Sequence, residues 1–117
     1  MTEDFLHYLW KYRHFAWENL RTTEDYPVEI QKGGYHNHDS GPDFQEALVR
    51  IDQQQWAGQV EIHIRSSDWD RHGHQKDSAY DNVVLHVVYE HDRAIQTSRG
   101  TTLPTIELKG RFDEYEY

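Results

Sequence analysis

The sequence of 117 residues contains no cysteine and is short of positive charge. Without cysteine the chain can form neither disulfides nor thiolate metal sites, so any bound metal must be held by imidazole and carboxylate groups. Lys and Arg number 12 against 21 Asp and Glu, which gives a net charge of −9 with histidine neutral. This charge disfavours nucleic acid as a partner, because non-specific binding depends on Lys and Arg neutralising phosphates.

Long apolar runs are missing as well. No segment approaches the roughly 18 apolar residues of a membrane-spanning helix, so we expect no membrane partner. The acidic beginning, from Met1 to Asp4, is the opposite of the basic start of a secretory signal. These absences predict a cytoplasmic protein.

The length fits a single domain over residues 1–117. Hydrophobic residues make up 36% of the chain and aromatic residues 14%, so we expect a core rich in large aromatic side chains. Apolar residues at helical spacing predict a helix over residues 3–20. Strand-like runs follow at residues 28–31, 44–52, 56–65, 83–89 and 103–108.

The order of these elements indicates the fold class. The runs at 44–52 and 56–65 are separated by three glutamines and predict a hairpin. The run at 83–89 is apolar on both faces, which is typical of a central strand covered on both sides. We therefore expect an α/β or α+β domain, with an N-terminal helix packed on a mixed sheet of about five strands.

Seven of the nine histidines fall between His36 and His91, among many carboxylates. A first cluster surrounds Asp43, which a Gly-Pro turn places at the start of a strand, shortly after His36 and His38. The carboxylate there is a candidate metal ligand, although for Asp43 taken alone turn chemistry is the favoured explanation, because Asp beside Pro and Gly is common in turns.

A second cluster is the pair Glu61 and His63 in an apolar strand. Residues at i and i+2 of a strand point to the same face, so this carboxylate and this imidazole can bind one cation together. The alternative is that both lie on the solvent-exposed face of an edge strand.

A third cluster follows in a polar segment. His72 and His74 form a His-x-His chelate, and Asp77 is either a further ligand or a group that orients one. We expect His86, in the apolar run at 83–89, to be a hydrogen-bonded core residue more than a ligand. The remaining histidines are expected at the surface: His7, His14 and His91.

Several of these segments resemble an uncharacterised bacterial family, a domain of unknown function. The resemblance covers nearly the whole chain and is carried by GYHNHDSGPDF at 34–44, WAGQVEIH at 56–63, SDW at 67–69, HGH at 72–74 and NVVLHVV at 82–88. Members of that family are generally several times longer. The resemblance therefore implies that this chain is the N-terminal portion of a longer protein or a short relative, whose partner is the remaining polypeptide or a second copy of itself.

The order of helix, strand, Pro-Asp at the start of a strand and Glu-x-His in the next strand is similar to the PD-(D/E)XK nucleases. This resemblance implies a restriction-endonuclease-like core in which Asp43 and Glu61 hold Mg²⁺, joined by a carboxylate of the first helix, here Glu18. His63 stands where that superfamily has a lysine. A neutral imidazole cannot supply the lysine's fixed positive charge, but it can act as a base or a ligand.

These patterns together predict a divalent-metal-dependent phosphodiesterase or nuclease-like domain. Asp43 and Glu61 would bind Mg²⁺ or Mn²⁺, and His63 would orient or deprotonate the attacking water. The pocket would be completed by further metal-binding residues: His36, His38, His72, His74 and Asp77.

Two alternatives remain open from the sequence. In the first, histidines hold Zn, Fe or Ni in a centre with another hydrolytic function. In the second, the chain is a non-catalytic interaction module of a larger protein, and its histidines and acids form a buried hydrogen-bond network.

Overall fold

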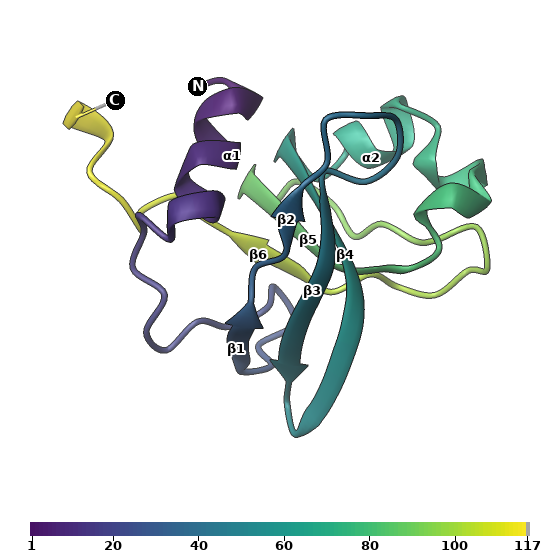
Figure 1. The fold of residues 1–117 in the computed structure, drawn as a ribbon, viewed down its shortest axis with the longest axis horizontal. Helices are drawn as coiled ribbons and strands as arrows, with labels where there is room; N and C mark the ends of the chain where they lie inside the picture. The colour runs from purple at the N-terminus through teal and green to yellow at the C-terminus, as the bar shows by residue number, and fades with distance from the viewer. Residues whose placement is uncertain (117) are drawn as a thin grey trace.

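The computed structural model describes residues 1–116, which form one layer of sheet with helices on both faces (Figure 1). The elements in chain order are helix α1 (Glu3–Tyr12), strands β1 (Val28–Lys32), β2 (Tyr35–His36), β3 (Phe44–Ile51) and β4 (Gln54–Arg65), helix α2 (Asp68–Arg71), the 3₁₀ helices η1 (His74–Lys76) and η2 (Ser78–Tyr80), strands β5 (Val83–Glu90) and β6 (Thr105–Glu107), and η3 (Glu114–Glu116).

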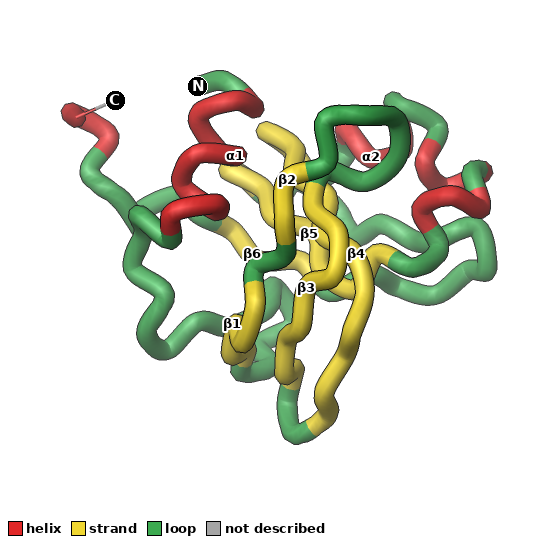
Figure 2. The backbone as a smooth tube through the Cα atoms, in the orientation of Figure 1, coloured by secondary structure: helices red, strands yellow, loops and turns green. Residues whose placement is uncertain are grey.

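The sheet is mixed, as expected, and has six strands in the order β1-β3-β4-β5-β6, with β2 also paired to β3. Strand β3 runs antiparallel to β1, β2 and β4, whereas β5 runs parallel to both β4 and β6. The α/β expectation is therefore confirmed. Figure 2 shows the long β3–β4 hairpin extending below the rest of the sheet, with α1 and α2 at its opposite end.

Helix α1 is shorter than the predicted helix over residues 3–20. The Thr2 hydroxyl accepts a hydrogen bond from the Phe5 N–H at 3.1 Å and caps the start of the helix. Arg13 adopts the left-handed conformation, with φ 54°, and ends the helix after Tyr12. Phe15 is nevertheless buried, because the apolar spacing continues into an irregular segment that still packs on the core.

The two faces of the sheet carry separate apolar clusters. On one face, Leu6 and Trp10 of α1 pack on Val60 and Ile62 of β4 and on neighbouring residues of β3 and β5. On the other face, Trp69 of α2 packs with a smaller set. Because side chains alternate along a strand, the β4 residues next to Val60 and Ile62 face the α2 side. Those residues are Glu61 and His63.

No helix within residues 1–116 has both the length and the apolar character that crossing a membrane requires.

Gly58 lies where β4 passes closest to the start of β5. A Cβ atom added at this position would lie 2.4 Å from the Asn82 carbonyl oxygen and 2.6 Å from Cγ1 of Val84. We therefore expect Gly58→Ala to destabilise the fold by about 1–3 kcal/mol, the usual cost of an overpacked contact. Urea denaturation measures this loss, with Ala57→Ser at the neighbouring exposed position as the control. Equal stabilities of the two variants would contradict the close approach.

Candidate metal centre

The centre is built from the second half of β4 and the segment that returns over it. Glu61 and His63 lie on β4, where Glu61 is paired with His86 of the parallel strand β5. Helix α2 follows, and Gly73, with φ 77°, makes the left-handed turn between α2 and η1. A residue with a side chain adopts this conformation only at a cost, so glycine is favoured between His72 and His74.

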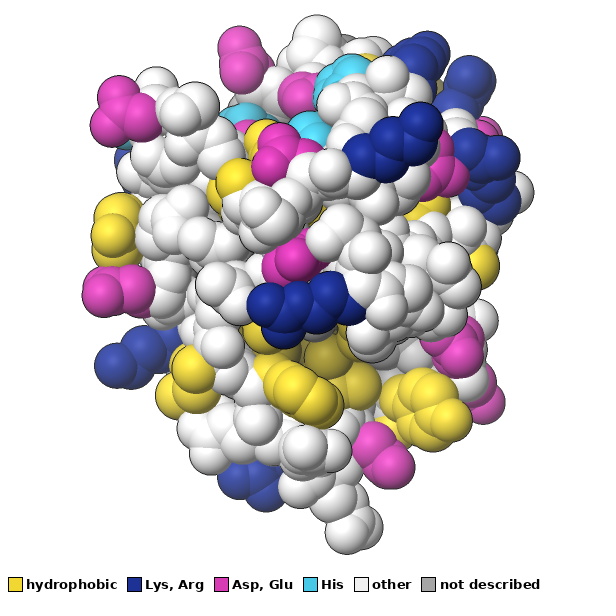
Figure 3. Space-filling view, turned by 90° about the vertical axis from the view of Figure 1, so that its right-hand side faces the viewer, with side chains coloured by type: hydrophobic (Ala, Val, Ile, Leu, Met, Phe, Trp, Pro, Cys, Tyr) yellow, Lys and Arg dark blue, Asp and Glu magenta, His cyan; other side chains and the backbone are white. Residues whose placement is uncertain are grey.

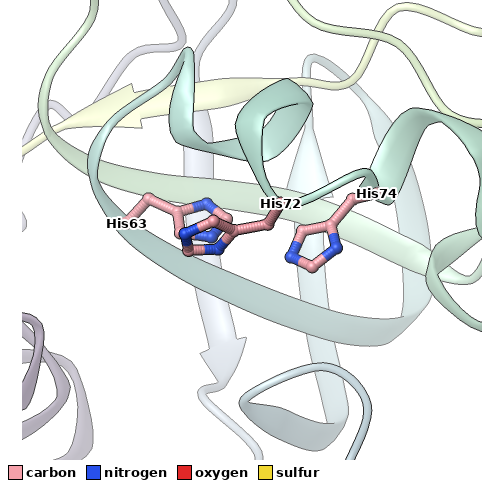
Figure 4. A group of neighbouring side chains, drawn as sticks. All are labelled: His63, His72 and His74. Carbon is pink, nitrogen blue, oxygen red and sulfur yellow. The ribbon is translucent and has the colours of Figure 1, made fainter.

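Three imidazoles converge at this point. One ring nitrogen from each of His63, His72 and His74 lies within 4.8 Å of the other two. Figure 4 shows the three rings lying together between β4 and the α2–η1 segment. His63 and His74 are buried, at 1% and 7% exposure, whereas His72 is exposed. The group is therefore open to solvent on the side of His72. We call these three residues the imidazole group.

Glu61 brings a carboxylate to the imidazole group. Its Oε2 lies 2.9 Å from Nε2 of His74 and 3.4 Å from Nε2 of His63. Its other oxygen, Oε1, accepts a hydrogen bond from the Asp43 backbone N–H at 3.1 Å. The side chain is almost completely buried. One carboxylate oxygen and at least two imidazole nitrogens therefore face a single point.

Asp43 lies beside Glu61, at the residue before β3. Its Oδ2 accepts the Ile62 backbone N–H at 2.8 Å and lies 3.4 Å from Nε2 of His7. The Asp43 N–H donates to Glu61, and the Asp43 carboxylate accepts from the Ile62 N–H. These two hydrogen bonds connect the start of β3 to β4. The structure thus brings Asp43 and Glu61 side by side, while Asp43 stands outside the imidazole group.

Burial and the neighbouring charges set the protonation of the carboxylates. Burial and the charge of Asp43 raise the pKa of Glu61 to about 10. Burial acts to raise the pKa of Asp43. Hydrogen bonds with His7 and Glu61 outweigh this effect and hold that pKa below its usual value. Glu61 therefore keeps a proton at neutral pH unless a cation takes the place of that proton.

The buried histidines are neutral for the same physical reason. Burial, with His74 and His72 adding to it, lowers the pKa of His63 to about 3. Burial likewise lowers the pKa of His74. A neutral imidazole has a free lone pair, which is the form that binds metals.

Other residues predicted as ligands lie outside the imidazole group. The His36 ring stacks on Phe44, with centroids 4.8 Å apart, and contacts the rings of His7 and His38 at 5.0 and 4.3 Å. Asp77 is exposed, and its carboxylate accepts the Ala79 N–H at 2.9 Å and so caps η2. Among residues 1–116, the group that could hold a metal thus includes His72 and His74 but not His36, His38 or Asp77.

His86 is a core residue, as expected. It is completely buried, and its Nε2 lies 2.7 Å from Nδ1 of His63. The edge of the Trp69 ring system packs against it, with centroids 5.3 Å apart. His86 therefore contacts the Nδ1 side of the His63 ring, whereas Nε2 of His63 faces Glu61.

The sequence reasoning missed the contribution of α1. His7 was expected at the surface, but it is half-buried and contacts Asp43. Glu18 lies in the exposed segment after α1 and not in a helix. The α1 carboxylate that interacts with Asp43 is Glu3, whose pKa is raised by burial and by the charge of Asp43. The sequence feature that indicates this role of α1 is the i, i+4 spacing of Glu3 and His7, which places both side chains on one face of a helix beside Leu6.

A hollow of about 420 Å³ borders the centre. Pro42, Gln59 and Tyr80 are among its lining residues, and the Tyr80 ring also stacks on His74 with centroids 3.7 Å apart. A larger hollow of about 920 Å³ lies over β3 and β4 around Gly34 and Gly58, which the imidazole group does not line. The imidazole group does not line the smaller hollow either, but Tyr80 connects that hollow to His74.

Comparison with known proteins gives one match. No curated protein and no solved structure matches the chain. One family model matches residues 3–116, which confirms the resemblance to an uncharacterised family. The chain belongs to DUF2851, a family described as protein of unknown function.

Proposed function

We propose that this domain binds one divalent transition-metal ion through the imidazole group and Glu61, and uses it in a hydrolytic reaction. The observation that carries the proposal is the convergence of three imidazole nitrogens within 4.8 Å of one another, with Oε2 of Glu61 at 2.9 and 3.4 Å from two of those rings. A cation there would replace the proton that Glu61 otherwise keeps.

The ligands favour a transition metal over Mg²⁺. Imidazole suits Zn²⁺, Fe²⁺ and Ni²⁺, whereas Mg²⁺ prefers carboxylates, carbonyls and water. The Mg²⁺ expectation depended on Asp43 and Glu61 as a pair of oxygen ligands. Oδ2 of Asp43 and Oε1 of Glu61 each accept a backbone hydrogen bond, while Oε2 of Glu61 faces His63 and His74.

Each residue then has a distinct role in hydrolysis. A bound metal lowers the pKa of a water molecule that it coordinates. His63 is engaged through both nitrogens, toward Glu61 and toward His86, so it acts as a ligand more readily than as a base. Asp43, which its hydrogen bonds keep ionised, would accept a hydrogen bond from a metal-bound water molecule at the edge of the centre.

A phosphodiester is the substrate class that we propose. Asp43 at the start of β3 and Glu61 on β4 adjoin, as the nuclease-like arrangement requires. The side chains of Arg71, which is paired with Asp68, and of Lys76 are exposed on either side of the His72–His74 turn. Figure 3 shows His and acidic side chains near the top of this face, with Lys and Arg next to them.

Metal analysis is the first test. Protein purified without chelator is expected to retain about one equivalent of transition metal through dialysis. A metal at 100 times its dissociation constant stabilises a fold by about 2.7 kcal/mol. For a domain of this size we therefore expect the melting temperature to rise by roughly 10 °C over protein in EDTA. A melting temperature that neither EDTA nor any metal changes would support the non-catalytic module instead.

Cleavage is the second part of the same test. Metal-loaded protein is incubated with single-stranded DNA, duplex DNA, RNA and a chromogenic phosphodiester, beside the variants Asp43→Asn and Glu61→Gln. We expect cleavage by the wild type and only background by Glu61→Gln. If the protein retains metal but cleaves no phosphodiester, the proposal of a metal site remains supported and phosphodiesters are ruled out as the substrate class.

A further inference from the structure

We propose that His86 is a positioning residue of the metal centre: it accepts the Nδ1 proton of His63 and so keeps Nε2 of His63 free to bind the ion. The inference rests on the proposed metal site and goes further, because it assigns a function to a histidine that binds no metal. It also fixes which nitrogen of His63 is the ligand.

The fold holds the two rings in one arrangement. Nδ1 of His63 and Nε2 of His86 are 2.7 Å apart, and the ring planes are nearly perpendicular at 80°. The side chains are 1% and 0% exposed on the neighbouring parallel strands β4 and β5. Trp69 packs against the His86 ring from α2. Neither imidazole can turn away without opening a close-packed region.

A single proton lies between these two nitrogens, because they are at hydrogen-bond distance and one of them must donate to the other. If His86 donated it from Nε2, the proton of His63 would have to be on Nε2, pointing at Glu61. That form of His63 has no lone pair for a metal. If His63 donates from Nδ1, its Nε2 is bare on the side of Glu61 and His74. Only the second arrangement is compatible with metal binding.

Within residues 1–116, the far side of His86 has no partner that would select one tautomer by a hydrogen bond. Its Nδ1 is buried and has no hydrogen-bond partner among the described residues. That atom is an unpaired N–H in one arrangement and an unpaired lone pair in the other. The tautomer is therefore decided at the His63 end, where the metal and Glu61 lie.

A histidine in this place has an electrostatic consequence. Metal-bound histidines commonly donate their second N–H to a carboxylate, a backbone carbonyl or water. Neutral His86 accepts the same hydrogen bond without adding negative charge behind the ion. The ion then retains more of its positive charge, which favours an anionic ligand such as a phosphodiester.

The direct test is the tautomer of each ring in the wild-type protein. With ¹⁵N-labelled histidine and one equivalent of Zn²⁺, long-range ¹H–¹⁵N spectra are expected to show His63 protonated at Nδ1 with a metal-shifted Nε2. His86 is expected to be protonated at Nδ1 only. A proton on Nε2 of His86, or metal ligation through Nδ1 of His63, would overturn the inference.

Two variants provide the second readout. His86→Leu removes the acceptor and is expected to weaken Zn²⁺ binding by about 10–100-fold, the usual effect of losing such a partner. His86→Gln can still accept through its amide oxygen and is expected to restore most of the affinity. A purely structural role would lower the melting temperature of the chelated protein in both variants without this difference in affinity.

The outcomes separate the two proposals. If the wild type and both variants bind Zn²⁺ equally, the role of His86 is wrong and the metal site stands. If the wild type binds no metal, both proposals fail. If His86→Leu does not fold, the proposed role of His86 is tested by the tautomers in the wild-type spectra and by the Zn²⁺ affinity of His86→Gln.

Discussion

Chelated protein is expected to lose about 1.4 kcal/mol of stability per pH unit between about pH 7 and pH 9. The cause is Glu61, whose pKa is about 10 in the folded protein against an ordinary value of 4.5. The folded state therefore binds one more proton than the unfolded state throughout this range. Its stabilising contribution is complete below pH 4.5 and is lost as the pH rises towards 10, so alkaline conditions favour unfolding.

His63 acts in the opposite sense and in a different range. Its pKa is lowered from 6.5 to about 3, so its contribution is present above 6.5 and is lost as the pH falls below that value. Measurements above about pH 7 therefore exclude His63. Burial acts to lower the pKa of His7, but its hydrogen bond with Asp43 raises that pKa, and this contribution is common to the wild type and the Glu61 variant. Urea denaturation in EDTA at three pH values compares the wild type with Glu61→Gln, which cannot ionise. We expect a falling profile for the wild type and a flatter one for the variant. Parallel profiles would mean that Glu61 is ionised in the metal-free fold.

Alanine at His63 or His74 is expected to weaken metal binding by roughly a hundredfold or more. Structural zinc sites with four ligands contribute about 10–16 kcal/mol in total, so one ligand accounts for about 2.5–4 kcal/mol, against the roughly 2.7 kcal/mol of a hundredfold change. Competition with a chromogenic chelator measures the affinity. His74 is the more informative position, because η1 lies outside the sheet and its replacement disturbs the core less.

The matched control is His14→Ala. His14 is exposed after the end of α1, where its Nδ1 shares a hydrogen bond with the Tyr8 hydroxyl at 2.9 Å. Its replacement removes one imidazole from the chain and should leave the metal affinity unchanged. An equal loss of affinity in His14→Ala and His74→Ala would show that the metal binds at scattered histidines and not at the imidazole group.

Local patterns were sufficient to predict several parts of the centre. The alternation of Val60, Glu61, Ile62 and His63 predicted that the carboxylate and the imidazole share one face of a strand, and both contact His74 in the segment after α2. The unbroken apolar run that became β5 predicted a strand covered on both faces. These predictions hold because side-chain direction in a strand depends only on position along the chain.

Local sequence patterns could not predict which residues that are distant in the chain contact each other. The chain has two His-x-His pairs, His36 with His38 and His72 with His74, and nothing in their spacing shows which of them meets Glu61. That depends on how α2 and η1 return over β4. The contact between His7 and Asp43 likewise depends on where α1 lies against the start of β3. The two-residue strand β2 is too short to produce a periodic signal.

The unequal exposure of the three imidazoles has a consequence for ion exchange. His74 packs against Trp69 and Tyr80, and His63 is buried as well, whereas His72 faces the solvent. An incoming ion would therefore meet His72 before the other two rings and shed its hydration water there in steps. Departure would follow the same route in reverse, so the residence time of the ion would be governed by the mobility of that one outer side chain more than by the two inner ligands.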